Sequence, residues 1–127
     1  MPYTEIKVLV VDDDPTTRRI IKKIAAQIGF TDIVEAENGA EAFAKVQEQE
    51  FGLILSDWDM PVMNGMEFLE KVRKDERYTE IPFIMITAND TRENIILAAK
   101  ARVSQYIVKP FTVQALKAKI DKVLLVS

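Results

Sequence analysis

The chain contains neither cysteine nor histidine. Without cysteine it cannot form disulfides, use a thiol nucleophile or bind a metal through sulfur. Without histidine it cannot contain a Ser-His-Asp catalytic set, a histidine-ligated zinc or a phosphohistidine. Any metal that it binds must therefore be held by oxygen atoms, which favours Mg²⁺, Ca²⁺ or Mn²⁺.

Long apolar runs and dense basic stripes are also missing. No apolar run approaches the ~20 residues that a membrane-spanning helix needs, so we expect no membrane partner. The first seven residues lack the charged and apolar regions of a signal peptide, which predicts a cytoplasmic protein. The net charge of −3 argues against nucleic-acid binding.

The composition is typical of one folded domain. Of the 127 residues, 48% are hydrophobic and 29% are charged, and no linker, repeat or low-complexity segment divides the chain. We therefore expect residues 1–127 to form a single domain without a separate output domain, and we expect a monomer.

Short apolar runs alternate with stretches in which apolar residues recur at helical spacing. Strands are expected at 7–11, 32–36, 53–57, 83–87 and 105–108, and helices at 15–28, 39–47, 65–73, 92–101 and 113–124. Repeated strand–helix units with short connections predict an α/β fold, in which helices cover both faces of a parallel sheet through right-handed crossovers. The residues expected to face the core include Ile20, Ile21, Ile24, Ala25 and Ile28 in the first helix, and Met66, Leu69 and Val72 in the third.

Polar residues lie at the ends of four predicted strands. Asp12 and Asp13 follow the first strand, Asp57 ends the third, Thr87 ends the fourth, and Lys109 follows the fifth. The carboxyl ends of parallel strands meet at one edge of the sheet, where open α/β sheets bind ligands. The second strand contributes no chemical group, which fits an edge strand. We therefore expect these five side chains to lie together.

Each of these residues also has an ordinary structural explanation. An acid can simply end a strand or, like Asp14, complement a helix N-terminus. Thr87 can be a β-forming residue with a locally bonded hydroxyl, Lys109 a surface lysine, and Tyr106 a core residue. The joint occurrence of three acids, a hydroxyl and an ammonium favours a functional site.

The chemistry of this set is that of phosphoryl transfer. Three neighbouring carboxylates repel one another unless a cation lies among them, and Mg²⁺ fits best when neither histidine nor cysteine is present. A cation, an ammonium and a hydroxyl stabilise a phosphoryl group during its transfer. The carboxylate nearest to the metal can then act as a nucleophile and form an acyl phosphate.

Four segments resemble the receiver domain of bacterial two-component response regulators, in the family's order and spacing. They are VLVVDDDPTTRRII, LILSDWDMPVMNGMEFL, PFIMITA and YIVKPFT, which together extend over nearly the whole chain. Together with the segment 94–98 they resemble most closely the single-domain chemotaxis regulators of this family. The resemblance implies a flavodoxin-like fold with strand order 2-1-3-4-5.

The resemblance also implies a role for each residue at the strand ends. Asp57 would accept a phosphoryl group from a histidine kinase, and Lys109 and Thr87 would contact the phosphoryl oxygens. Tyr106 would follow Thr87 from an exposed to a buried rotamer. The protein would be a signalling protein rather than an enzyme, with chemistry limited to phosphotransfer and autodephosphorylation at Asp57.

The cofactor and the partners are implied in the same way. Asp13, Asp57 and the backbone carbonyl of Asp59 would ligate Mg²⁺, with Asp12 acting through water. The phosphorylated protein would bind the flagellar motor switch through its fourth helix, fifth strand and fifth helix, and a phosphatase would be a further partner. This face offers Asp90, Arg92, Ile95, Tyr106, Val108, Phe111 and Lys119.

The chain departs from the family pattern at four positions. The family usually has glycine where this chain has Arg102 and Gln105, and a left-handed Arg102 would cost roughly 1 kcal/mol relative to glycine. Asp59 and Asn89 replace the asparagine and glutamate of the best-known chemotaxis members. Because both positions flank the phosphoryl site, the lifetime of the phosphorylated state in those members cannot be assigned to this chain.

Two other functions remain open. Residues 12–16, DDDPT, also fit the nucleophile motif of haloacid-dehalogenase-type phosphatases, with Asp12 as nucleophile and Asp14 as general acid. Against this interpretation, no acidic pair lies between Lys109 and Asp121, and the chain leaves no room for a substrate-selecting cap. Within the receiver family, the alternative is a phosphorelay component or phosphate sink without a flagellar target.

Overall fold

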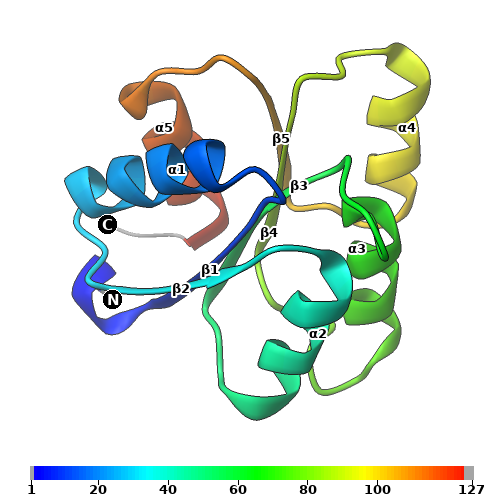
Figure 1. Ribbon diagram of the computed structural model, residues 1–127, viewed down its shortest axis with the longest axis horizontal. Coiled ribbons are helices and arrows are strands. Elements are labelled where there is room, and N and C mark those ends of the chain that lie inside the picture. Colours follow the sequence, from blue (N-terminus) through cyan, green and yellow to red (C-terminus); the bar gives the residue numbers. More distant parts are fainter. Residues whose placement is uncertain (1, 125–127) are drawn as a thin grey trace.

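Residues 2–124, which this computed structural model describes, contain a five-stranded parallel sheet covered by helices on both faces (Figure 1). The strand order is β2-β1-β3-β4-β5, which confirms the predicted fold. In chain order the elements are η1 (Tyr3–Glu5), β1 (Lys7–Val11), α1 (Pro15–Ile28), β2 (Asp32–Ala36), α2 (Gly39–Glu48), β3 (Leu53–Asp57), α3 (Gly65–Lys74), β4 (Phe83–Thr87), α4 (Arg92–Lys100), β5 (Gln105–Val108) and α5 (Val113–Leu124).

Successive strand residues build two separate cores, one on each face of the sheet. Val8 and Val10 of β1 pack toward α1 and α5, whereas Leu9 and Val11 pack toward α2 and α3. This alternation follows from the two-residue period of a strand. Figure 1 shows α1 and α5 on one side of the sheet and α2 and α3 on the other. Residues of β3 and β4 are buried throughout, and the edge strand β2 is mostly half-exposed.

Most predicted core positions are buried, Ile21, Ala25 and Ile28 in α1 and Leu69 and Val72 in α3, but Ile20 and Met66 differ from the prediction. In α1, Ile20 is 54% exposed, because Ile21 and Ala25 form the inner stripe and Ile20 lies to one side of it. In α3, Phe68 is fully buried against Phe83 of β4, whereas Met66 is only partly buried. The short helix η1 was not predicted, because three residues show no periodicity.

Local hydrogen bonds fix the helix starts that follow β1 and β3. Asp14 accepts a hydrogen bond from the backbone of Thr16 and caps α1 as predicted. Asn64 and Glu67 form a capping box at the start of α3. The backbone of Gly65 approaches β3 so closely that a Cβ atom would lie 2.1 Å from the carbonyl oxygen of Asp57. Only glycine fits at position 65, and its backbone N–H donates to the carbonyl of Trp58 at 2.8 Å, which holds the β3–α3 loop against the strand end.

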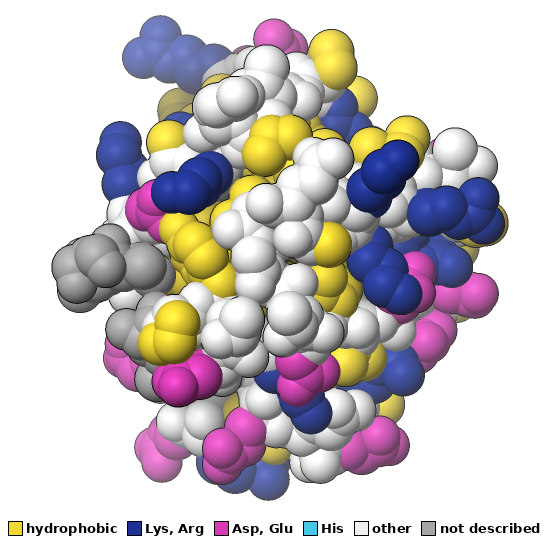
Figure 2. Space-filling model, turned by 90° about the vertical axis from the view of Figure 1, so that its left-hand side faces the viewer, with side chains coloured by type: hydrophobic (Ala, Val, Ile, Leu, Met, Phe, Trp, Pro, Cys, Tyr) yellow, Lys and Arg dark blue, Asp and Glu magenta, His cyan; other side chains and the backbone are white. Residues whose placement is uncertain are grey.

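The side of the molecule that includes α1 and the N-terminus mixes charges of both signs with apolar patches (Figure 2). This face therefore presents no continuous basic surface of the kind that nucleic acids require. None of the helices within residues 2–124 combines the length and the apolar character needed to cross a membrane.

Candidate functional site

The carboxyl edge of the sheet brings together the five side chains predicted from the strand ends. β1 and β4 both pair with β3, and β5 pairs with β4, all in parallel. Carboxylate oxygens of Asp12, Asp13 and Asp57 lie within 4.8 Å of one another. The backbone N–H of Lys109 donates to the carbonyl of Thr87 at 2.9 Å, which fixes the lysine beside the end of β4.

Asp57 lies at the centre of this edge, at the end of a fully buried strand. The backbone N–H of Trp58 donates to its Oδ1 at 2.9 Å, and only 8% of the residue is exposed. Burial raises the pKa of Asp57 to about 6, and the nearby charge of Asp12 adds to this effect while the ammonium of Lys109 opposes it. A carboxylate can act as a nucleophile toward an electrophilic phosphorus.

Asp12 is the more enclosed of the two buried acids, with 1% of its surface exposed. Its Oδ1 accepts from the backbone of Asp14 at 2.9 Å, and its Oδ2 accepts from Nζ of Lys109 at 3.1 Å. Arg18 donates to its carbonyl oxygen at 2.8 Å. The bonds from Asp14 and Lys109 hold the carboxylate in one orientation, facing the lysine.

Lys109 bridges the two buried carboxylates. Its Nζ lies 3.1 Å from Asp12 and 3.4 Å from Asp57. One ammonium cannot balance three acids, so the edge keeps a net negative charge. That charge favours a cation, and it also opposes an incoming phosphoryl group until a cation is bound.

The acidic group is compatible with a small octahedral cation. Oxygens on opposite sides of Mg²⁺ are about 4.2 Å apart, since each lies about 2.1 Å from the ion. The 4.8 Å spread of the oxygens of Asp12, Asp13 and Asp57 is therefore only slightly wider than such a shell requires. Asp13 is exposed, which leaves one side of the group open to water, and Mg²⁺ retains several waters.

A chain of contacts leads from Thr87 to Tyr106 through Asn89, a link that the sequence did not predict. The Oγ1 atom of buried Thr87 accepts from the backbone N–H of Asn89 at 3.1 Å. The hydroxyl of Tyr106 donates to the backbone carbonyl of Asn89 at 2.5 Å. Tyr106 is half-buried, and its ring meets the edge of Trp58 at a centroid distance of 6.4 Å. Thr87 and Tyr106, the two residues predicted to switch, are thus both hydrogen-bonded to the backbone of Asn89.

The residues predicted for the partner face differ in accessibility. Ile95 is 42% exposed, and Asp90 and Arg92 are exposed as well. Phe111 is partly buried and packs against the core beneath α1 and α5. The half-exposed members of the set are Tyr106, Val108 and Lys119. Arg102, which follows α4, has φ of 66°, the left-handed conformation considered for it from the sequence.

Known proteins match this chain along nearly its whole length. The family model of the response regulator receiver domain matches residues 8–121. The chemotaxis protein CheY1 of Helicobacter pylori is 48% identical over 120 residues, which cover 94% of this chain and 97% of the relative. The chemotaxis protein CheY of Pseudomonas aeruginosa is 46% identical over 118 residues, covering 93% and 95%.

A solved structure agrees with the sequence matches. The chemotaxis protein CheY4 of Vibrio cholerae superposes with a TM-score of 0.86 at 34% identity, covering 94% of this chain and 98% of the other. The resemblance predicted from the four sequence motifs is thereby confirmed. This chain belongs to the family of response regulator receiver domains, with chemotaxis regulators of the CheY type as its relatives.

Proposed function

We propose that this protein accepts a phosphoryl group from a histidine kinase onto Asp57 and then binds a protein target. The observation that supports it most is the place of Asp57, a buried carboxylate at the end of a central strand, 3.4 Å from the ammonium of Lys109 and within a group of three acids. In the reaction, a carboxylate oxygen of Asp57 attacks phosphorus while the bond from phosphorus to the donor's imidazole nitrogen breaks. The electron pair of that bond stays on the nitrogen, and because the other ring nitrogen carries a proton, the imidazole leaves as the neutral histidine of the kinase.

The other residues of the edge would stabilise the transferred group. The ammonium of Lys109 would turn from the carboxylates to a phosphoryl oxygen, and the hydroxyl of Thr87 would donate to another. Asp13, Asp57 and the backbone carbonyl of Asp59 would hold Mg²⁺, with Asp12 acting through water. The ion would neutralise negative charge at the phosphoryl oxygens.

The proposed target surface consists of α4, β5 and α5. Ile95 provides an exposed apolar contact and Arg92 an exposed charge on this face. Because the relatives are named as chemotaxis proteins, we take the flagellar motor switch as the target. A phosphorelay component or a phosphate sink would use the same chemistry at Asp57 without this target.

The geometry disfavours phosphatase chemistry with Asp12 as nucleophile. That chemistry needs Asp14 as a general acid, and a general acid must hold a proton near neutral pH. Hydrogen bonds from the hydroxyl of Thr17 and the backbone of Thr16 lower the pKa of Asp14 instead. Asp14 is therefore a helix cap and does not suit the role of a general acid.

A transfer assay with a histidine kinase tests the proposal. The kinase is first labelled with radioactive ATP, and we expect rapid transfer of the label to the wild-type chain in the presence of Mg²⁺. Asp57→Asn should take no label, whereas Asp59→Asn should retain it, because only the backbone carbonyl of Asp59 has a proposed role. Label on the Asp57→Asn chain would refute the assignment of the phosphoacceptor.

A further inference from the structure

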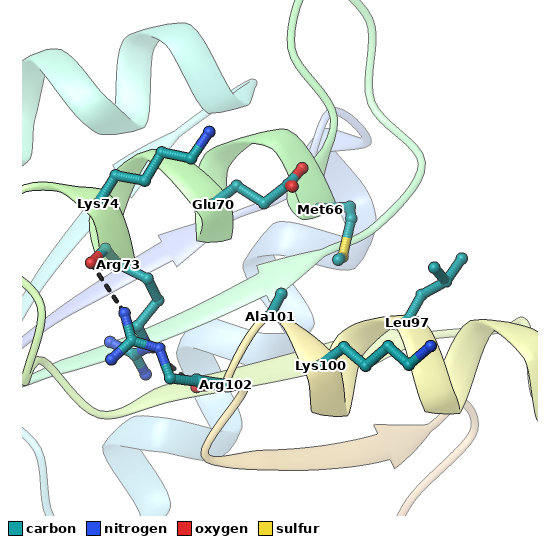
Figure 3. A pocket seen from close by; sticks show the side chains of 8 residues that line it. All are labelled: Met66, Glu70, Arg73, Lys74, Leu97, Lys100, Ala101 and Arg102. Atoms are coloured by element: carbon teal, nitrogen blue, oxygen red, sulfur yellow. Dashed lines mark hydrogen bonds between the residues drawn. The ribbon is translucent and has the colours of Figure 1, made fainter.

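A groove of about 310 Å³ lies between α3 and α4, away from the acidic edge (Figure 3). Side chains from both helices line it, Glu70 and Lys74 from α3 and Leu97 and Lys100 from α4. The residues that line it are Met66, Glu70, Arg73, Lys74, Leu97, Lys100, Ala101 and Arg102.

The charge of the groove is opposite to that of the molecule. Four of its eight lining residues are cationic and only Glu70 is acidic, whereas the whole chain has a net charge of −3. Lys74 and Lys100 are exposed, and neither forms an ion pair with any other residue of the described part of the chain. Two cations at the rim are therefore available to a negatively charged ligand.

The groove also has an apolar side that the fold does not use. Leu97 is 47% exposed, and Ala98 is the single buried residue of α4. Ile95 and Ile96, next to Leu97, are also exposed. Successive helical residues are about 100° apart, so Ile95 and Leu97 lie about 200° apart around the helix. Leu97 lines the groove, and Ile95 belongs to a different surface.

Reciprocal hydrogen bonds hold the inner end of the groove in one shape. Nε of the buried Arg73 donates to the carbonyl of Arg102 at 2.9 Å, and the guanidinium of Arg102 donates to the carbonyl of Arg73 at 3.0 Å (Figure 3). Arg73 also donates to the carbonyls of Thr79 and Ile81. A preformed wall binds a ligand with little loss of conformational entropy.

We infer that this groove binds an acidic, amphipathic segment of a protein partner. An apolar side chain of that segment would lie against Leu97, Met66 and Ala101. Carboxylates on either side of it would pair with Lys74 and Lys100. A small inorganic anion would leave the apolar side unused, so the combination of charges and apolar surface favours a peptide. The groove does not include Asp57, and it shares α4 with the proposed target face, to which we assign Ile95 and Arg92 rather than Leu97.

An NMR titration with short blocked peptides tests this inference. The ¹⁵N-labelled protein is titrated with a helical peptide of leucine and glutamate. A second peptide has serine in place of each leucine and keeps the charge, and a third has lysine in place of each glutamate and keeps the apolar pattern. We expect only the leucine–glutamate peptide to shift amide signals of residues 66–74 and 97–102. Leu97→Ser should abolish these shifts. Lys74→Glu with Lys100→Glu should weaken binding about tenfold, since two exposed ion pairs are lost and the reversed charges repel the peptide.

The control is a double variant with the same change in net charge, Lys23→Glu with Lys122→Glu, at exposed positions on α1 and α5. It should bind the peptide as the wild type does. If both double variants bound the peptide equally weakly, the binding would be due to nonspecific charge attraction, and the inference would be overturned. Equal shifts with the serine peptide or with inorganic phosphate would show an anion site instead. Shifts centred on Ile95 and Tyr106, or no shifts at all, would also contradict it.

Discussion

Asp57 combines burial with the nearby charge of Asp12, and this should make it a source of instability in the metal-free protein. Its pKa of about 6 lies above the 3.8 of a free carboxyl, so the folded state binds the proton more tightly than the unfolded state. The free energy of unfolding therefore falls as the pH rises from about 4 to about 6. We expect Asp57→Asn, which removes this charge, to stabilise the metal-free protein by about 3 kcal/mol near neutral pH.

Urea unfolding in EDTA measures this effect at two pH values. The gain from Asp57→Asn should shrink toward zero near pH 4, where the wild-type carboxyl of the folded state is protonated. Asp59→Asn, at an exposed neighbour, is the control and should change stability little. A destabilised Asp57→Asn chain near neutral pH would contradict the account of this carboxylate.

Val62 has an unfavourable backbone conformation for its residue type. Its φ is 70° although it is β-branched, and 83% of the residue is exposed, so packing does not compensate. Left-handed conformations cost non-glycine residues roughly 1–2 kcal/mol. We expect Val62→Gly to raise the free energy of unfolding by about 1 kcal/mol, with a smaller gain for Val62→Ala, which keeps the Cβ atom. Unchanged stability in both variants would show that the loop relaxes freely.

At the scale of elements, the end of α4 depends on two opposing effects at Arg102. Its φ of 66° is strained, but its guanidinium donates to the carbonyl of Arg73 and to the hydroxyl of Thr79. We expect Arg102→Ala to destabilise by about 1–2 kcal/mol, because it loses the bonds and keeps the strain. Arg102→Gly should lose less, since glycine removes the strain. Thermal unfolding of the wild type, Arg102→Ala and Arg102→Gly gives their order of stability. If Arg102→Gly were less stable than Arg102→Ala, this explanation would be contradicted.

The sequence predicted the elements better than it predicted their contacts. All five strands have the expected bounds, because short apolar runs between turn formers locate buried strands without knowledge of their neighbours. The acids, threonine and lysine were placed together because parallel strands end at one edge. The burial of Arg73 was not predictable in the same way. Its acceptors, the carbonyls of Thr79, Ile81 and Arg102, meet only once the loops are folded. The hydrogen bonds of Thr87 and Tyr106 to the backbone of Asn89 were not predictable either, for the same reason.

At the scale of the whole molecule, we propose that phosphorylation of Asp57 and target binding are coupled through Thr87. If the Thr87 hydroxyl turns toward a phosphoryl group, the backbone N–H of Asn89 loses its hydrogen-bond acceptor. The hydroxyl of Tyr106 donates to the backbone carbonyl of the same residue. By reciprocity, phosphorylation and target binding favour each other by the same factor, typically about 5- to 150-fold. We expect Thr87→Ala to remain phosphorylatable but to lose most of this coupling.

The coupling is measured as the affinity for the N-terminal peptide of the motor switch protein, with and without beryllofluoride. Thr31→Ala, an exposed threonine far from the site in sequence, is the matched control and should keep the wild-type enhancement. Equal enhancement in the wild type and in Thr87→Ala would show that Thr87 does not transmit the signal.

The most direct test of the central claim is the intact mass of the protein after incubation with acetyl phosphate. We predict that the wild type gains the mass of one phosphoryl group with Mg²⁺ and almost none in EDTA, and that Asp57→Asn gains none in either condition. The adduct should be lost in base, as expected for an acyl phosphate. One phosphoryl group on Asp57→Asn, together with its loss from Asp12→Asn, would contradict the account and would make Asp12 the nucleophile.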